Sequence, residues 1–355
     1  MQLVGGDILT HLESVFANDP KSFPRHGTMR YPEVLRGWIG KVEADLLPHV
    51  TAAAVSIDGG RLTAHDVEHV RRVRAVAARL LQESRHDLTP YELVFLLLAI
   101  YLHDLGNALG REGHERRAKE VLKAGGAALT LDGVEIRTAQ TIARAHGGRH
   151  GGSKDTIGVL PEEQSVWSET VRTRLVAAVL RLADELADDP ARADRVGLAS
   201  GTLPPGSEVY HRFAIALHSQ VPNGRERTIL LKLDVDDHLL FRRALGKNEA
   251  EVQFLDEIFE RTLKTYREAR YCSRFMRPFL DFERVRVEIS IFEDDELVRT
   301  VAYTIAETGY GDDGRSIYDL SPELERFEGE RLTAERLAGL LAGAEAGSDA
   351  EGATS

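Results

Sequence analysis

The sequence has little cysteine, few aromatic residues and no long apolar run. Cys272 is the only cysteine among 355 residues, which excludes an intramolecular disulfide and a zinc site built from cysteines. The longest apolar run, residues 93–102, is about half as long as a membrane span requires. Residues 1–7 contain neither a basic segment nor an apolar one, so a secretory signal is not expected. These absences predict a cytoplasmic protein that does not bind membranes.

Positive charge is also in deficit. The chain has 57 Asp and Glu against 45 Lys and Arg, a formal net charge of −12. A protein that grips a nucleic-acid backbone needs a clustered basic surface, so nucleic acid is the less favoured partner. A small anionic substrate is still compatible with this charge, because a bound cation is itself a strong local positive charge.

Hydrophobic periodicity and capping signals predict helices through most of the first 190 residues. The clearest start is Thr89-Pro90-Tyr91-Glu92, a capping box with proline at the first helical position. The helix that follows is apolar on every side, which is typical of the centre of a domain, and Gly106 is placed to end it. Thr63 is the expected cap of the preceding helix. Further helices are expected at residues 8–16, 32–47, 112–123, 134–146 and 162–188.

The character of the sequence changes near residues 201–206, Gly-Thr-Leu-Pro-Pro-Gly. Strands are expected at residues 209–217 and 228–235, a helix at 247–271, and a hairpin at 285–292 and 296–307. We therefore expect a mainly α protein with a C-terminal α+β module. Its predicted parts are a helical domain (1–200), the α+β module or lid (205–320), a helical tail (321–341) and a disordered end (342–355).

Histidine and aspartate gather where the apolar helix ends and on neighbouring helical segments. His103 and Asp104 are adjacent there, and burying both is costly unless they coordinate something. Packing or a helix terminus explains any one histidine alone. His65 and Asp66 could either support a metal ligand or be ordinary residues of a first helical turn. As a set, however, imidazoles and carboxylates predict a metal site. The six candidate ligands are His69, His103, Asp104, His114, His146 and Asp184.

This ordered pattern resembles that of the HD-domain metal-dependent phosphohydrolases over roughly residues 30–195. The resemblance implies an HD-type helical bundle and a metal held by His69, His103, Asp104 and Asp184. It also implies that Asp104 bridges to a second metal, and that His114 and His146 are the extra histidines of dinuclear members. Asp104, His114 and His146 are then the expected catalytic residues. The cofactors expected are two divalent ions, drawn from Mn, Fe, Ni and Mg.

Two details refine the resemblance. Residues 31–38 and 63–70 are similar to an HD variety of bacterial conflict and antiphage systems, which implies a role in antiviral defence. By contrast, His103-Asp-Leu-Gly106 continues as Asn107-Ala-Leu-Gly110, whereas the deoxynucleoside triphosphohydrolase branch continues with His-Pro-Pro. That departure counts against a triphosphohydrolase.

The function implied is hydrolysis of a phosphoester or phosphoanhydride bond in a nucleotide or related small substrate, by water that two metals activate. Arg149 and Lys154, in the glycine-rich loop 146–154, are candidates for binding the phosphate, or else ordinary solvated loop charges. The alternatives are an HD nuclease acting on single strands, disfavoured by the charge and the few aromatics, and a non-catalytic nucleotide sensor of a defence system. A homo-oligomer and a defence-system partner both stay open.

Overall fold

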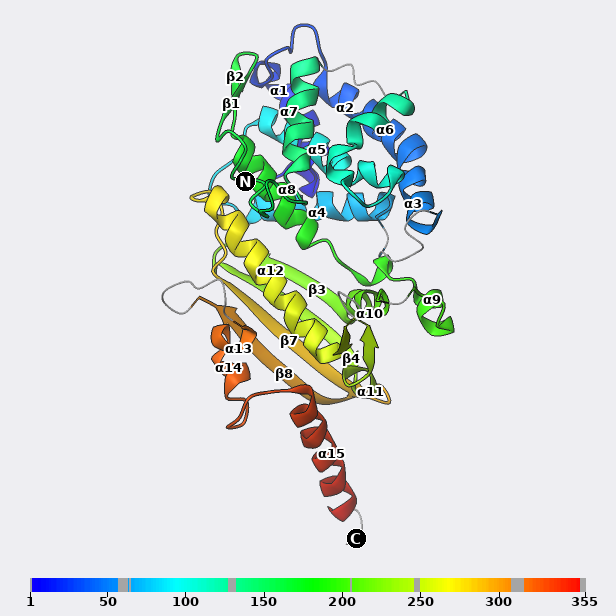
Figure 1. Cartoon of the computed structure of the whole chain (residues 1–355). Coiled ribbons are helices and arrows are strands. Elements are labelled where there is room, and N and C mark those ends of the chain that lie inside the picture. The colour runs from blue at the N-terminus through cyan, green and yellow to red at the C-terminus, as the bar shows by residue number, and fades with distance from the viewer. Residues whose placement is uncertain are drawn as a thin grey trace. The chain divides into compact units, whose positions relative to one another are not determined.

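The computed structural model describes residues 2–56, 63, 65–126, 132–204, 206–245, 250–307 and 316–351. The chain divides into two compact units, which Figure 1 shows in one colour ramp from end to end. The helical unit comprises Met1–Asp188, Pro222–Arg227 and Glu268–Phe282, and the mixed unit comprises Asp189–Val221, Thr228–Arg267 and Glu283–Ser355. The chain is therefore mainly α with an α+β module. The division falls after Asp188, earlier than the sequence suggested, and the helical unit also takes in two later segments.

The helical unit is built around α5 (Pro90–Leu102), whose residues from Tyr91 to Leu102 are all buried. Because α5 is apolar on every side, it needs neighbours on every side, and it contacts α1, α2, α4, α7 and α8. The surrounding helices are α1 (Ile8–Asn18), α2 (Tyr31–Lys41), α3 (Leu47–Ser56), α4 (Val67–Glu83), α6 (Ala118–Ala124), α7 (Gly133–Arg144) and α8 (Thr173–Glu185).

The N-terminus of α5 is fixed by the predicted capping box. Thr89 Oγ1 accepts from Glu92 N at 3.1 Å, and Glu92 Oε2 accepts from Thr89 N at 2.9 Å. The same buried carboxylate accepts two hydrogen bonds from the guanidinium of Arg172, the residue before α8, at 2.8 and 2.6 Å. Burial alone raises the pKa of Glu92, but the hydrogen bonds from Arg172 and Thr89 outweigh it and leave that pKa below its usual value. One carboxylate thus joins the start of α5 to the start of α8.

By length and composition, one segment of the described residues, Pro90–Leu109, is apolar enough to cross a membrane. This window is α5 with the 3-10 turn η4 (Leu105–Leu109) that follows it, and 89% of it is buried within the protein. Such burial is what the core helix of a globular domain shows.

Four expected features of the helical unit differ in the structure. Asp66, not Thr63, caps α4, because its carboxylate accepts from His69 N at 3.1 Å. Residues 112–123 form the 3-10 turn η5 (His114–Arg116) and then α6. Residues 162–188 form the hairpin β1 (Gln164–Val166) and β2 (Glu169–Val171) before α8. Finally, Gly106 lies inside η4 rather than at a helix C-terminus.

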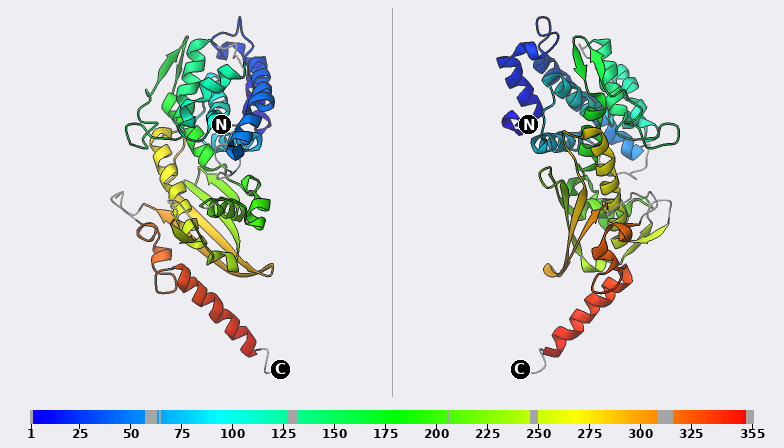
Figure 2. Two further views of the ribbon diagram at one scale, coloured as in Figure 1. Left: turned by 45° about the vertical axis from the view of Figure 1, so that its right-hand side comes forward. Right: turned by 90° about the vertical axis from the view of Figure 1, so that its left-hand side faces the viewer.

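The mixed unit contains a four-stranded sheet in the order β3 (Leu217–Asn223), β4 (Thr228–Asp236), β7 (Arg284–Glu293), β8 (Glu296–Ala306). The pair β4–β7 is parallel and β7–β8 is the predicted antiparallel hairpin. The part of α12 (Phe254–Met276) up to Arg267 lies across one face of the sheet (Figure 2), where Thr262 Oγ1 and the Tyr303 hydroxyl on β8 are 2.8 Å apart. A strand was expected at residues 209–217, but the chain forms the helix α10 (Glu208–Ala216) there, and β3 begins only at Leu217.

Shorter elements complete the mixed unit. They are α9 (Arg195–Ser200), α11 (Asp237–Leu240), β5 (Arg243–Leu245), β6 (Glu251–Gln253), α13 (Ile317–Leu320), α14 (Pro322–Glu325) and α15 (Ala334–Glu351). We expected disorder from residue 342 onward, whereas α15 continues to Glu351. Residues 352–355 lie outside the described residues.

We predict that Arg172→Met lowers the free energy of unfolding of the protein by about 2 kcal/mol at pH 7. The substitution leaves the Glu92 carboxylate, 1% exposed, without its cationic partner; the penalty is reduced because Arg172 itself is 35% exposed. The pKa of Glu92 is lower in the folded chain than in the unfolded one. Its contribution to the free energy of unfolding is therefore fully present above the unfolded pKa and is lost as the pH falls through the folded pKa. Denaturant titrations at pH 7 and pH 4 measure both effects. Arg36→Met, which breaks the surface pair with Glu13, is the control, and an equal loss there would contradict the assignment.

Candidate metal centre

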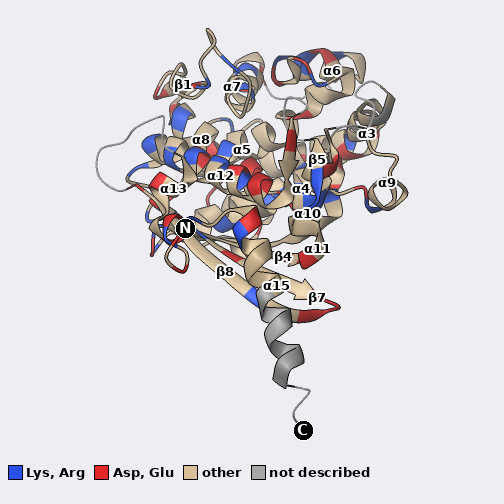
Figure 3. Cartoon of the chain, turned by 60° about the horizontal axis from the view of Figure 1, so that its bottom comes forward, with Lys and Arg blue, Asp and Glu red and all other residues tan. Residues whose placement is uncertain are grey.

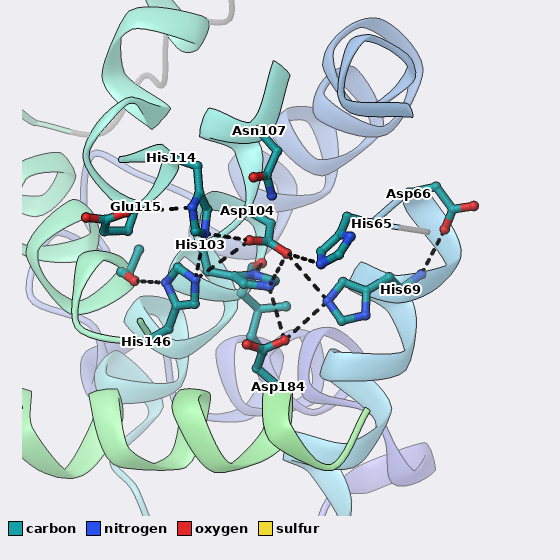
Figure 4. A network of polar contacts seen from close by, with 12 residues as sticks. His65, Asp66, His69, His103, Asp104, Asn107, His114, Glu115, His146 and Asp184 are labelled. Atoms are coloured by element: carbon teal, nitrogen blue, oxygen red, sulfur yellow. Dashed lines mark hydrogen bonds and ion pairs between the residues drawn. The ribbon is translucent and has the colours of Figure 1, made fainter. Parts of the chain in front are cut away.

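All six predicted ligands meet at the end of α5 (Figure 4). His103 and Asp104 follow α5 directly, His69 lies in the first turn of α4, and Asp184 lies in the last turn of α8. His114 begins η5 and His146 follows α7. Five of these side chains are buried, and that of Asp184 is 27% exposed. Five separate segments thus supply ligands to one point.

One half of the cluster surrounds Oδ2 of Asp104. This oxygen is 3.4 Å from His103 Nε2 and 3.6 Å from His69 Nε2. The same two nitrogens lie 3.6 and 3.2 Å from Asp184 Oδ1. His69, His103 and Asp184 form one of the two groups in the described residues whose donor atoms lie within 4.8 Å of one another.

The other half surrounds Oδ1 of the same carboxylate. His114 Nε2 is 3.1 Å from it and His146 Nε2 is 3.7 Å from it. Asp104, His114 and His146 form the second group of converging donors. In Figure 4 Asp104 accordingly stands between His114 and His146 on one side and His65 and His69 on the other. Each oxygen of Asp104 therefore faces a different set of imidazoles.

Backbone carbonyls set the direction of three of the imidazoles. Nδ1 of His103 faces Ile100 O at 2.6 Å, Nδ1 of His114 faces Arg111 O at 3.0 Å, and Nδ1 of His146 faces Ala143 O at 2.7 Å. A carbonyl accepts only, so in each case Nδ1 carries a proton, and Nε2 is the nitrogen that would offer its lone pair to a cation in the cluster. In each case the carbonyl belongs to the third residue before the histidine.

This donor set fits a divalent cation on three counts. Nε2 of His103 is buried and makes no hydrogen bond within the described part of the chain, although buried polar atoms are nearly always satisfied. The Nε2 atoms of His114 and His146 are only 3.3 Å apart, and two lone pairs that close repel unless a proton or a cation lies between them. Finally, two ligands each about 2.1 Å from one cation are about 3.0–3.4 Å apart, close to the distances between the donors here.

The electrostatics of the cluster depend on its two carboxylates. Burial disfavours the charged form of His103, but Asp104 and Asp184 outweigh it and raise the pKa of His103 to about 10. Conversely, burial alone raises the pKa values of Asp104 and Asp184, yet the neighbouring histidines hold both well below the usual value. The two carboxylates are therefore stable only beside positive charge, and the protonated imidazole of His103 supplies that charge in the metal-free chain.

Gly106 allows the two halves to approach each other. A Cβ atom there would lie 1.9 Å from the carbonyl oxygen of His114, far inside van der Waals contact. Only glycine lets η4 pass this close to the backbone of η5, and that approach brings His114 to Asp104. The glycine expected to end a helix instead holds a ligand in place.

The two predicted phosphate-binding residues are exposed, and no described contact joins them to the cluster. The guanidinium of Arg149 donates to Gly152 O within its own loop at 2.7 Å, and Lys154 also has a partner. Arg111, which the sequence analysis missed, is closer: its Nη1 is 3.6 Å from Asp104 Oδ1 and 3.3 Å from Asn107 Oδ1. In the sequence, only its position seven residues after Asp104 could have indicated that Arg111 lies near the site, and the segment that carries it is irregular.

His65 and Asp66 make different contacts in the structure. His65 Nε2 is 3.8 Å from Asp104 Oδ2, so this ring joins the first half of the cluster at its edge. Residue 65 precedes α4, so the ring reaches the site from the segment before the helix. The carboxylate of Asp66 holds the backbone of His69 rather than its ring.

We predict that Gly106→Ala weakens metal binding by at least about tenfold, since displacing a ligand or its support costs that much in affinity. The added methyl group pushes the backbone of His114 away from Asp104. Isothermal titration of the metal-free protein with Mn²⁺ measures the effect. Gly37→Ala, in an open position on α2, is the matched control and is expected to change nothing; unaltered affinity in Gly106→Ala would refute the role of this glycine.

We also predict that metal binding releases protons at pH 7 and weakens as the pH falls. Because the pKa of His103 is raised to about 10 in the metal-free chain, the ring is protonated at neutral pH and must lose that proton to act as a ligand. Titrations in buffers of different ionisation enthalpy count the protons released. An observed heat that does not depend on the buffer would contradict this prediction.

Comparison with known proteins places the chain in a family. A family model described as HD-CE matches residues 48–262, which is more than half of the 355 residues and includes all six predicted ligands. Comparison with curated proteins found no match, and comparison with solved structures found none either. The protein belongs to the HD-CE family.

Proposed function

We propose that this protein is a metal-dependent phosphohydrolase that cleaves a phosphoester or phosphoanhydride bond of a nucleotide or a related small substrate. The observation that carries the proposal is the division of the Asp104 carboxylate, with Oδ2 facing His69 and His103 and Oδ1 facing His114 and His146. A carboxylate shared in this way suits a pair of divalent cations, and pairs of that kind serve phosphoryl chemistry.

The residues that would hold the two cations fall into the two halves of the cluster described above. His69, His103 and Asp184 would serve one, His114 and His146 the other, and Asp104 both. When bound, two divalent cations lower the pKa of water and neutralise charge on phosphoryl oxygens. The chain's own contribution is to fix the imidazoles, through the carbonyls that hold each Nδ1, and to bury the site. For a set of four imidazoles and two carboxylates we expect Mn or Fe rather than Ca.

Arg111 is our candidate for binding the phosphate of the substrate. Its side chain is 43% exposed, and its guanidinium reaches Asp104 and Asn107. Arg111 therefore lies at the edge of the metal cluster, with its charged end directed towards the cluster. A cation beside Asp104 would repel this guanidinium, which is long enough to turn towards an incoming phosphate. Guanidinium groups bind phosphate oxygens with paired hydrogen bonds. Arg149 and Lys154 are the alternative, and their exposure favours solvent.

The test is product release by the full-length protein from four substrate classes: nucleoside triphosphates, dinucleotide polyphosphates, cyclic dinucleotides and short single strands. Each is assayed with Mn, Fe, Ni and Mg. We expect one nucleotide class to be turned over only with metal. We expect the His103→Ala/Asp104→Ala variant to lose at least about a thousandfold in kcat, since the activated water depends on the cations. Arg111→Ala is expected to raise KM at least about tenfold, and Arg149→Ala to change it little.

Each other outcome changes the assignment. Cleavage confined to single strands would replace the proposal with a nuclease. Metal bound without any turnover would refute the enzyme and favour a nucleotide sensor. Loss of substrate affinity in Arg149→Ala but not in Arg111→Ala would return the phosphate-binding role to the glycine-rich loop.

A further inference from the structure

The mixed unit has a pocket of its own, made of residues that belong to neither half of the metal cluster. It is open to solvent and has a volume of about 530 Å³, within the range of small-molecule sites. Three arginines line it, Arg195 at the start of α9, Arg212 on α10 and Arg242 after α11. Figure 3 shows blue ribbon on α9 and on the chain beside α10. A concentration of guanidinium groups in one pocket is unexpected in a chain of net charge −12.

The charge of this pocket is only partly balanced. Oε1 of Glu208 accepts from Arg212 Nε at 2.8 Å, lies 2.6 Å from Arg212 Nη2 and lies 3.2 Å from Arg242 Nε. One carboxylate oxygen therefore serves two guanidiniums. A second acid, Asp194, directly precedes Arg195 in the chain, and its Oδ1 accepts from Gly197 N at 2.8 Å, which caps α9. Among the described residues, three arginines against the carboxylates of Glu208 and Asp194 leave the pocket with a net positive charge.

Arg212 shows that the pocket is built rather than accidental. Its side chain is only 8% exposed, and a buried guanidinium is stable only with hydrogen-bond partners that hold its charge. The fork of Arg212 is held along α10 by Glu208, four residues earlier, so its orientation is fixed before any ligand arrives. Arg195 and Arg242 are exposed and can adjust to the ligand.

The remaining walls of the pocket are of a different kind. Leu198 and Ala199 of α9 and Ile215 of α10 line it together with Ser200 and Gly201. A pocket with one cationic side and one apolar side suits a molecule that has a phosphate group and a flat apolar part. We propose that this pocket binds a nucleotide, with the phosphates against Arg195, Arg212 and Arg242 and the base against Leu198 and Ile215.

The test measures binding of ATP, inorganic phosphate and adenosine to the full-length protein by isothermal titration in a metal chelator. The chelator removes cation-dependent binding at the metal cluster. We expect ATP to bind more tightly than phosphate, and adenosine to bind weakly, because the cationic and the apolar walls both contribute. Arg195→Ala/Arg242→Ala is expected to weaken ATP binding at least about tenfold, since it removes two charged partners of the phosphates. Both side chains are exposed, and thermal unfolding of the variant checks that it is folded.

Arg243→Ala is the matched control, because Arg243 is the next residue, is exposed and pairs with Glu251 instead. It should leave the affinity unchanged, as should His103→Ala/Asp104→Ala. Equal ATP affinity in the double arginine variant and the wild type would overturn the proposal, and so would an absence of ATP binding in the wild type. Phosphate that binds as tightly as ATP would overturn the assignment of a nucleotide. Loss of binding in His103→Ala/Asp104→Ala alone would place the ATP at the metal cluster.

Discussion

The helical unit depends on the buried carboxylate of Asp104. Its side chain is almost wholly enclosed, and a lone charge in such surroundings is strongly disfavoured. The chain offsets that cost by surrounding Asp104 with five imidazoles and a guanidinium. They come from α4 and the residues just before it, from the residues that follow α5 and α7, from η5 and from the segment after η4. These elements therefore have to converge on one point, and the packing of the helices around α5 satisfies that requirement.

Orientation within this cluster is largely local. Each of His103, His114 and His146 finds its acceptor three residues earlier in the chain, so the backbone that carries the ring also turns it. Tertiary packing then has only to set the distances between segments. The close pass of Gly106 by His114 sets one of them, and the Arg181–Glu268 pair, with Nε to Oε2 at 2.7 Å, holds α8 one turn before Asp184. Ligand direction and ligand distance thus have separate causes.

The same distinction explains what could be predicted from the sequence. The apolar run of α5 and the capping box at Thr89 are strong local signals, and both were confirmed; the six ligands were chosen from the residues that such signals place. The hairpin before α8 gave no such signal, because its two-residue loop, Trp167-Ser168, lacks the asparagine or glycine that usually marks one, although Trp167 adopts a φ of 55°.

The wrong prediction of a strand at residues 209–217 and the failure to find Arg111 have a similar cause. Val209, Phe213 and Ala216 are buried at helical spacing, and Glu208 pairs with Arg212 one turn on, but β-branched and aromatic residues in a short run also suit a strand. Tertiary packing decided between them. Arg111 lies in an irregular segment, where no period predicts which way a side chain points.

Net charge was the weakest guide to function, and the cluster shows why. A total of −12 suggests a protein that repels phosphates, yet a substrate responds to the field at the site rather than to the sum over the surface. Asp104 and Asp184 carry the only two acidic side chains among the six ligands. Two divalent cations held by this set would keep a local charge of about +2 after both carboxylates are counted. A centre of that charge would attract the phosphate groups of a substrate whatever the sign of the total charge of the chain, because the nearest charges dominate the field at a site.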